Sequence, residues 1–269
     1  MTKPVILIAT TIYGDPTTGT VHNAYHMATM RLCRNAELDF IPLTAFVQAD
    51  IVRARSGIVR DFLAHPTATH ILFWDEDVVA EAEVLAPLIK ALLESGHDFV
   101  GVPYPKKKIQ WAKVWDWFYL NQRRPEPGEI DRVAFEYTAV RNEPTAEDLA
   151  RGDGLVATRL VNGFAELTRM GLGFTLVSRA CCERMVAFYG RERTSAVDAT
   201  ETPTFLDTGR DGKPVPTVAL FQLLVRDGLL LTDDYSFCDR WRAIGGKIHA
   251  YAGPHKLQHI GAFAYGRTE

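Results

Sequence analysis

The stretch His70-Ile71-Leu72-Phe73-Trp74-Asp75-Glu76-Asp77-Val78 is an apolar run that ends in three consecutive carboxylates. A short, continuous apolar run is typical of a strand that is buried on both faces of a sheet. Ligands in open α/β sheets bind beyond the carboxyl ends of such strands. The sequence therefore predicts a strand at His70–Trp74 and a candidate site at the acids that follow it.

From Val5 to Val102, apolar strand-like runs alternate with helical patterns, which is typical of βαβ units and a mostly parallel sheet. We expect strands at Val5–Ala9, Leu38–Leu43, His70–Trp74, Phe99–Val102, Gly173–Val177 and Lys247–Tyr251, and a further segment of the hydrophobic pattern at Val218–Val225. We expect helices that end near Asn35, that cover Ile51–Ala64, Glu81–Ser95 and Arg179–Tyr189, and that begin near Asp233. The predicted fold class is α/β, with a mostly parallel central sheet flanked by helices.

Three stretches break this pattern. Polar loops are predicted at Thr10–Gly19 and Arg191–Pro216, where Gly, Pro and polar residues are frequent. From Pro105 to about Gly163, lysines, tryptophans, prolines and acids alternate without a sustained period. We interpret this last stretch as an irregular insertion over the sheet edge.

The overall composition excludes several classes of protein. The chain has 269 residues, 30 Lys plus Arg and 33 Asp plus Glu, so its net charge of -3 gives no global attraction to nucleic acid or anionic lipid. No apolar stretch approaches the roughly 20 residues of a membrane span, and Pro4–Thr10 is too short for a signal-peptide core. We expect a cytoplasmic protein without stable membrane insertion. Its four cysteines lack metal-ligand spacing, and we expect them to be reduced and mostly buried.

The acidic group Asp75, Glu76 and Asp77 indicates a divalent metal. Adjacent carboxylates repel one another unless a cation or hydrogen-bond donors neutralise them. Oxygen ligands suit Mg²⁺ or Mn²⁺, and such a metal would bridge to diphosphate oxygens. The alternative is a solvated loop whose acids favour the start of the next helix without any metal.

Arg55 lies near the centre of the apolar face of its predicted helix, at about 100° per residue. That face is formed by Ile51, Val52, Ile58, Val59, Phe62 and Leu63. A buried arginine needs an anionic partner, and the candidates are a carboxylate of the Asp75 group or a nucleotide phosphate. A structural salt bridge, or a helix that starts after Arg55, is the alternative.

The acidic pair Asp233-Asp234 opens another predicted helix. Helical spacing places Asp234 with Phe237 and Trp241, so its carboxylate is expected in apolar surroundings, which raise a carboxyl pKa towards the range of a general base. Asp233 is expected to cap the helix. The alternative is that both residues only cap it.

Two further candidates are a histidine and a glycine turn. His259 stands between apolar residues near the C-terminus, where a core role is the alternative to a third metal ligand; His255 is its weaker substitute. Gly171-Leu172-Gly173-Phe174 leads into a strand and brings backbone close to a ligand, without the Gly-x-Gly-x-x-Gly spacing of a dinucleotide site.

The insertion offers two further features, each with two interpretations. Lys106–Lys108 is either a solvated loop or a basic loop over a diphosphate. The aromatic residues of 111–119 either pack the insertion or stack on a sugar.

In their order along the chain, these segments resemble the GT-A glycosyltransferases, especially the family-two-like bacterial enzymes. The matching segments are 4–14, Val52-Arg53-Ala54-Arg55 with Arg60, 69–77, 101–105, 171–174, 232–238 and His259. The resemblance implies a single GT-A domain over 1–269, with a nucleotide-binding half at 1–104, an insertion at 105–165 and an acceptor-binding half at 166–269.

The resemblance also implies roles for individual residues. Asp75 and Asp77 are similar to the Asp-x-Asp pair that holds the metal, and His259 to the histidine that completes this site. The remaining roles are a nucleoside-contacting loop at Thr10, Thr11 and Tyr13, donor contacts at Arg55, Asp75, Glu76 and Gly173, and a catalytic base at Asp234.

The expected reaction is a metal-dependent transfer of a sugar, with inversion, from a UDP- or GDP-linked donor to an acceptor hydroxyl. Glycan, lipid-linked sugar, protein and modified nucleic acid remain open as acceptors. One alternative is a sugar-1-phosphate nucleotidyltransferase, for which the loop 10–19 lacks the expected basic residue. The other is a non-catalytic nucleotide-sugar or glycan-binding module, which would need no base.

Overall fold

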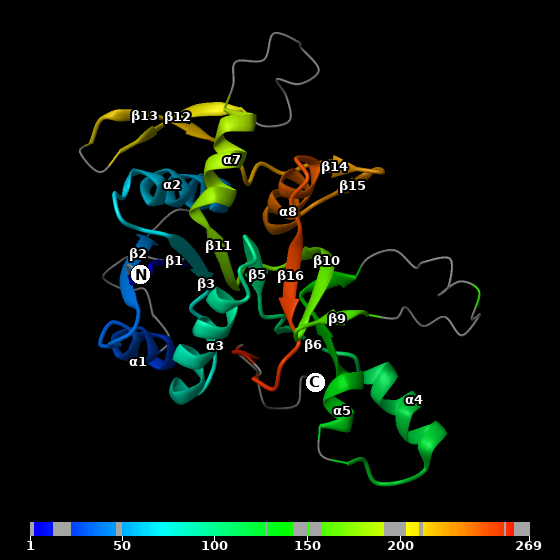
Figure 1. Ribbon diagram of the computed structural model, residues 1–269. Coiled ribbons are helices and arrows are strands. Elements are labelled where there is room, and N and C mark those ends of the chain that lie inside the picture. The colour runs from blue at the N-terminus through cyan, green and yellow to red at the C-terminus, as the bar shows by residue number, and fades with distance from the viewer. Residues whose placement is uncertain are drawn as a thin grey trace, which may run out of the picture.

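The protein folds around one large mixed sheet flanked by helices (Figure 1). This computed structural model describes residues 3–12, 23–46, 50–126, 128–141, 150, 158–190, 203–209, 212–255 and 257–260. The sheet consists of β1 (Val5–Ile12), β2 (Asp39–Phe46), β3 (His70–Trp74), β5 (Phe99–Gly101), β8 (Ala139–Arg141), β9 (Leu160–Val161), β10 (Phe164–Met170), β11 (Phe174–Ser178) and β16 (Ile248–Tyr251). Its strand order is β2-β1-β3-β11-β5-β16-β10-β8, and β9 also pairs with β10.

Most strands of this sheet point the same way, as the sequence predicts. β1 is parallel to β2 and β3, and β5 is parallel to β16. β11 is antiparallel to both β3 and β5, and β10 is antiparallel to β16, β8 and β9. The two reversed strands, β10 and β11, therefore interrupt an otherwise parallel sheet. The α/β fold class is confirmed.

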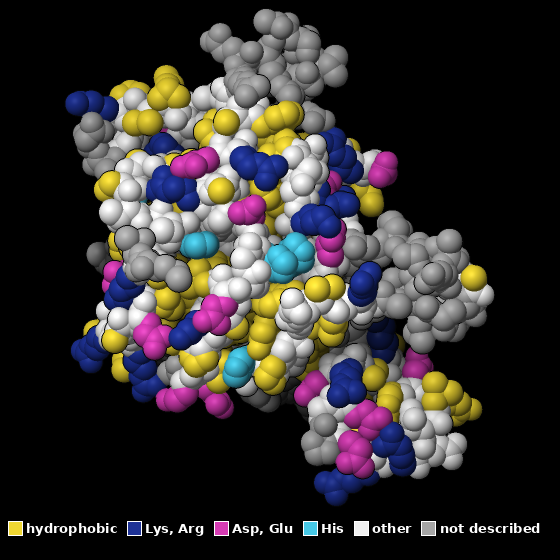
Figure 2. Space-filling model, viewed as in Figure 1, with side chains coloured by type: hydrophobic (Ala, Val, Ile, Leu, Met, Phe, Trp, Pro, Cys, Tyr) yellow, Lys and Arg dark blue, Asp and Glu magenta, His cyan; other side chains and the backbone are white. Residues whose placement is uncertain are grey.

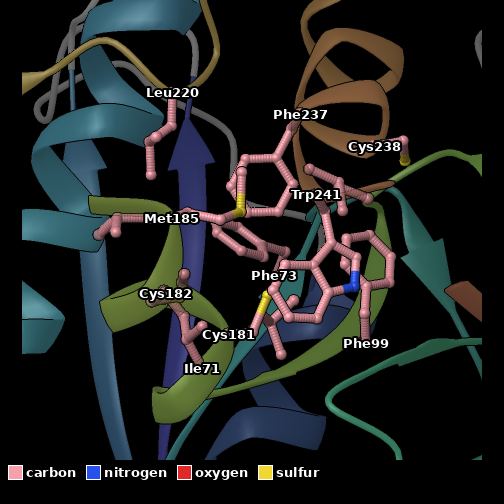
Figure 3. Close-up of a cluster of buried hydrophobic side chains, with 14 of the residues drawn as sticks. Ile71, Phe73, Phe99, Cys181, Cys182, Met185, Leu220, Phe237, Cys238 and Trp241 are labelled. Carbon is pink, nitrogen blue, oxygen red and sulfur yellow. The ribbon is translucent and has the colours of Figure 1, made fainter. Parts of the chain in front are cut away.

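Side chains of β3 alternate between two apolar clusters, one on each face of the sheet. Ile71 and Phe73 point into a cluster with helices α2 (Ile51–Ala64), α7 (Arg179–Tyr189) and α8 (Asp233–Ala243), which Figure 3 shows. Leu72 and Trp74 point into the other cluster, with α1 (Asn23–Leu32) and α3 (Ala82–Glu94). A strand alternates its side chains with period two, so a fully apolar strand is stable only between two covered faces.

The predicted bounds of Ile51–Ala64 and His70–Trp74 are confirmed, and the structure resolves the segment Val218–Val225 into a strand end and a turn. Val218 ends the hairpin strand β13 (Pro214–Val218), which pairs with β12 (Thr204–Thr208). Ala219, Leu220 and Phe221 then form a buried turn. An apolar run predicts burial, but it does not distinguish a strand from a buried turn that packs against the core. The hairpin also replaces the described part of the loop predicted at Arg191–Pro216.

The stretch predicted as irregular contains short elements in its described part. We call residues 105–137 the α4 lobe; it consists of β6 (Pro105–Ile109), α4 (Trp111–Asn121), α5 (Glu129–Ala134) and β7 (Phe135–Tyr137). β6 pairs with β7, and α4 packs against α5 away from the helices of the sheet (Figure 1). Downstream of the lobe, β8 returns the chain to the central sheet.

Two short pairs of strands complete the described elements. β14 (Val225–Arg226) pairs with β15 (Leu229–Leu230), and β4 (Val78–Val79) pairs with β17 (Gln258–His259). All four cysteines are free, and all but Cys33 are buried, which agrees with the prediction. Among the described residues, the helices are too short or too polar to cross a bilayer.

Candidate functional site

The acidic turn after β3 is held from both sides by backbone hydrogen bonds. The amide of Val78 donates to the carbonyl of Asp75 at 3.0 Å and closes a four-residue turn. The amide of Asp75 donates to the carbonyl of Gly173 on the neighbouring turn, also at 3.0 Å. The turn therefore presents its carboxylates at the carboxyl end of β3, where the fold class places ligands.

Arg55 brings three distant carboxylates together. Its buried guanidinium lies 3.3 Å from Asp75 and 2.6 Å from Asp233, and it also donates to Asp234. The capping side chain of Asp50 fixes the start of α2, so the helix includes Arg55 as predicted. The anionic partner that the buried arginine needs is thus the acidic start of α8 together with Asp75.

Two expectations about α8 are wrong. The N-cap is Thr232, whose hydroxyl accepts from the amide of Tyr235, and Asp233 is the first helical residue. Asp234 does not face apolar surroundings: its carboxylate accepts from Arg55 and from the amide of Leu172, at 3.2 Å for the latter. Helical spacing correctly placed Asp234 on the inner face of α8, but it could not show that a polar turn and Arg55 pack against that face.

The charges at Arg55 are unbalanced, because three carboxylates share one guanidinium. Burial lowers the pKa of Arg55, but Asp75 and Asp233 outweigh burial and raise it. Burial also raises the pKa of Asp75, and the nearby charges of Asp77 and Asp233 add to this rise against the opposing effect of Arg55. A further cation would stabilise this group of acids.

Asp77 contacts two basic residues that come from other elements of the fold. Pairing of β17 with β4 places His259 opposite Val78, and the ring Nε2 of His259 lies 3.4 Å from a carboxylate oxygen of Asp77. Lys107 of β6 donates to the other oxygen. Burial acts to raise the pKa of Asp77, but the hydrogen bonds from His259 and Lys107 outweigh it and lower the pKa to about 2.

The donor types at Asp77 and His259 fit a divalent cation. The Nδ1 of His259 lies 2.9 Å from the carbonyl of Pro105, and since a carbonyl only accepts, Nδ1 carries the proton. The ring Nε2 faces the carboxylate of Asp77, and this contact needs either a proton on Nε2, which makes it the donor to Asp77, or a cation in place of that proton. Lys107 supplies positive charge on the other side. Among the described residues, no group of three His, Cys, Asp or Glu side chains is arranged to hold a metal. Asp75, the third ligand expected from the sequence, contacts Arg55.

Gly173 is needed for a close approach of backbone and side chains. A Cβ at Gly173 would overlap the ring of Tyr104 and would lie 2.9 Å from a carboxylate oxygen of Asp75. The amide of Gly173 donates to the hydroxyl of Tyr104 at 3.0 Å. Burial and the charge of Asp75 raise the pKa of Tyr104, so its hydroxyl stays protonated. Sequence reasoning missed Tyr104, although its place just after the strand at Phe99 could have indicated it.

The remaining predicted residues lie around this centre or outside it. Thr10 and Thr11 are at the carboxyl end of β1, next to β3; Thr10 is buried, and its hydroxyl forms a hydrogen bond with that of Tyr25. Glu76 occupies the acidic turn beside Asp75. Tyr13 lies outside the described residues.

Comparisons with known proteins leave the family open. No family model matches the chain, and no curated protein matches it. Three solved structures that it resembles are A197 from STIV (13% identity, TM-score 0.47, covering 96% of this chain and 86% of that one), UDP-glucose pyrophosphorylase complexed with UDP-glucose (9%, 0.43, 94% and 92%) and 4-diphosphocytidyl-2C-methyl-D-erythritol synthase from Anaerococcus prevotii (10%, 0.33, 73% and 80%). At these identities and TM-scores, the likeness identifies neither an activity nor a ligand for this chain.

Proposed function

We propose that this protein is a metal-dependent glycosyltransferase that moves a sugar from a UDP- or GDP-linked donor to an acceptor hydroxyl. The main support is the meeting of two acidic segments, one after β3 and one at the start of α8, on Arg55. Donor activation and proton abstraction are separate tasks, and the two segments offer separate carboxylates for them.

A divalent metal, Mn²⁺ or Mg²⁺, would be held by Asp77 and His259, with Asp75 joining them when it turns from Arg55. When bound, such a metal neutralises the charge that develops on a departing diphosphate. The ammonium group of Lys107 donates to Asp77. A metal bound at Asp77 would displace this ammonium group, which could then contact the diphosphate. Thr10, Thr11 and Tyr13 would contact the nucleoside, and Glu76 and the backbone of Gly173 the rest of the donor.

Asp234 would accept the proton of the acceptor hydroxyl. One of its oxygens is fixed by the amide of Leu172, which leaves the second oxygen on Arg55. Arg55 would keep the carboxylate ionised and orient it until the substrates bind. Attack of the acceptor oxygen on the anomeric carbon, opposite the leaving diphosphate, would invert that carbon.

A thermal-shift screen of nucleotides and nucleotide sugars, each with and without Mn²⁺, tests the donor site. A ligand that binds only the folded state raises the melting temperature by mass action. We expect one diphosphate nucleotide to stabilise the protein in a metal-dependent way, and we expect Asp77→Ala to abolish this shift while exposed Asp227→Asn retains it. Preference for a triphosphate would favour the nucleotidyltransferase, and no shift with any diphosphate nucleotide would favour the binding module.

Turnover of the donor identified in this screen tests the base. Asp234→Asn should keep the metal-dependent shift but lose about 10²-fold or more in turnover, since a positioned base contributes about 10²–10⁴-fold. Near-normal turnover of a folded Asp234→Asn protein would contradict the assignment of Asp234 as the base. Asp227→Asn, in the β14–β15 turn, is the matched control because it makes the same chemical change on the surface.

A further inference from the structure

Tyr104 is a buried side chain whose hydroxyl packs against the glycine turn 171–174. It is 4% exposed, and a Cβ at Gly171 would lie 2.9 Å from its hydroxyl oxygen, while a Cβ at Gly173 would overlap the phenol. Any side chain at either position would push the hydroxyl away. The two glycines of this turn therefore leave the space that Tyr104 occupies.

Hydrogen bonds hold Tyr104 in place at both of its ends. Its backbone carbonyl accepts from the amide of Thr138 at 3.0 Å and from the Thr138 hydroxyl at 3.2 Å. The carbonyl of Thr138 in turn accepts from the amide of Gly171 at 2.7 Å. At the other end, the phenol hydroxyl accepts from the amide of Gly173 at 3.0 Å. The backbone and the hydroxyl of Tyr104 are thus both fixed relative to the glycine turn.

The hydroxyl of Tyr104 and one oxygen of Asp75 complement each other as donor and acceptor. Burial and the charge of Asp75 raise the pKa of Tyr104, so the hydroxyl keeps its proton, and this proton has no acceptor among the described residues. Arg55 contacts Oδ1 of Asp75, whereas Oδ2 accepts from no group in the described part of the chain. Oδ2 is also the oxygen that lies beside Gly173. An unused donor and an unused acceptor therefore lie next to the same glycine.

The ring of Tyr104 contacts a second candidate metal ligand. The ring centroids of Tyr104 and His259 lie 5.2 Å apart at an interplanar angle of 88°, which is an edge-to-face contact. The Nδ1 of His259 is held separately, on the carbonyl of Pro105. Tyr104 therefore touches His259 with its ring and lies near Asp75 with its hydroxyl.

We propose that Tyr104 is a positioning residue for the metal site. Its hydroxyl would donate to Oδ2 of Asp75 when that carboxylate turns from Arg55, and its ring would hold the imidazole of His259. This inference rests on the proposed function, because it takes Asp75 and His259 as ligands of Mn²⁺ or Mg²⁺. Groups that hydrogen-bond to metal ligands fix the orientation of those ligands.

A neutral donor suits this position. The other groups beside the two aspartates are cationic, because Arg55 contacts Asp75 and Lys107 donates to Asp77, and each would compete with a metal ion for its carboxylate. On the surface of the molecule, too, basic side chains lie beside acidic ones (Figure 2). A phenol donates one hydrogen bond without adding charge, so Tyr104 can hold Asp75 while a cation is bound.

The affinity of Tyr104→Phe for Mn²⁺ tests the hydroxyl apart from the ring. Phenylalanine keeps the ring against His259 and loses only the O–H group. We expect the Kd for Mn²⁺, measured by calorimetry without any nucleotide, to rise about 10–100-fold. Tyr189→Phe is the matched control, because its hydroxyl also bonds to backbone, at 2.9 Å from the carbonyl of Arg240, and it packs on the other face of the sheet. This control should bind Mn²⁺ like the wild type.

Two further variants test the contact between Tyr104 and Asp75. Gly173→Ala leaves both side chains intact but places a methyl group against the hydroxyl and 2.9 Å from Oδ2, so it should also weaken Mn²⁺ binding. It serves as the test should Tyr104→Phe fail to fold. Asp75→Ala should weaken Mn²⁺ binding by itself, and adding Tyr104→Phe should then weaken it no further, since the hydroxyl acts through Asp75.

The outcomes separate this inference from the proposed function. Wild-type Mn²⁺ affinity in a folded Tyr104→Phe protein would refute the role of Tyr104 and leave the transferase proposal standing. An equal loss of affinity in Tyr189→Phe, or the same further loss in the Asp75→Ala background, would also refute it, because the hydroxyl would then not act through Asp75. No binding of Mn²⁺ or Mg²⁺ by the wild type would refute both this inference and metal-dependent transfer.

Discussion

The central sheet and the α4 lobe use the same residue types in opposite ways. Trp74 and Trp241 are buried between layers of the sheet, whereas Trp111 and Trp115 lie on the surface of the lobe. Arg55 is buried on three carboxylates, whereas Arg124 is exposed and outside the described ion pairs. In the sheet, aromatic and basic side chains are buried and hold the layers together; in the lobe, Trp111, Trp115 and Arg124 are exposed.

Truncation of a core aromatic should have the largest effect. Phe237 is fully buried and stacks on Phe221 with ring centroids 4.5 Å apart. Phe237→Ala should destabilise the protein by about 4 kcal/mol through lost burial and a cavity. Trp115→Ala should change stability by less than about 0.5 kcal/mol. Urea denaturation measures both, and similar losses would mean that the lobe is packed as tightly as the sheet.

Removal of the buried guanidinium should come second. Arg55→Gln leaves Asp75, Asp233 and Asp234 facing one another and should destabilise the protein by about 3 kcal/mol. Arg124→Gln in the lobe should have almost no effect. The loss should shrink in the double variant with Asp75→Asn, which removes one of the repelling charges. An additive double variant would contradict the shared-guanidinium arrangement.

Enlarging a small residue should distinguish the two regions less strongly. Gly173→Ala places a methyl group against the ring of Tyr104 and near Asp75, and should destabilise the protein by about 1–3 kcal/mol. Ala112→Leu on the exposed side of α4 should be tolerated, since its added atoms meet solvent. Melting temperatures of both variants provide the comparison, and a harmless Gly173→Ala would show that the turn can move away from Tyr104.

Mild acid should have the smallest effect, and only on the sheet. His97 and His249 stack with ring centroids 3.5 Å apart; burial lowers both pKa values, and the charge of His97 lowers that of His249 further. A lowered folded pKa means that the unfolded chain binds more protons, so this stability is present above the unfolded pKa and is lost as the pH falls. His249→Gln should reduce the loss of melting temperature between about pH 7.5 and about pH 5.5. Equal losses of melting temperature in the wild type and in His249→Gln would exclude the histidine pair as the source of the acid sensitivity. The α4 lobe contains no histidine and should not contribute to this effect.

The local fold around β3 could be predicted from the sequence because its signal is periodic. Buried strands and amphipathic helices repeat their apolar residues with the period of the backbone, so Ile51–Ala64 and His70–Trp74 have the predicted bounds. For the segment 218–225 the sequence indicated no element type, and the α4 lobe was predicted as irregular although it contains two helices and two strands. In both, whether the apolar side chains are buried depends on elements that are distant in the sequence.

The sequence by itself determined the α/β class, the acidic turn after β3 and the need of Arg55 for an anionic partner, because periodicity and burial are local consequences of side-chain chemistry. Only the tertiary structure decided which carboxylates meet Arg55, that Lys107 and His259 flank Asp77, and that Trp111 and Trp115 of α4 stay exposed. These contacts join residues that are far apart in the chain. Strand order and crossover connections set them, and no spacing in the sequence records that order.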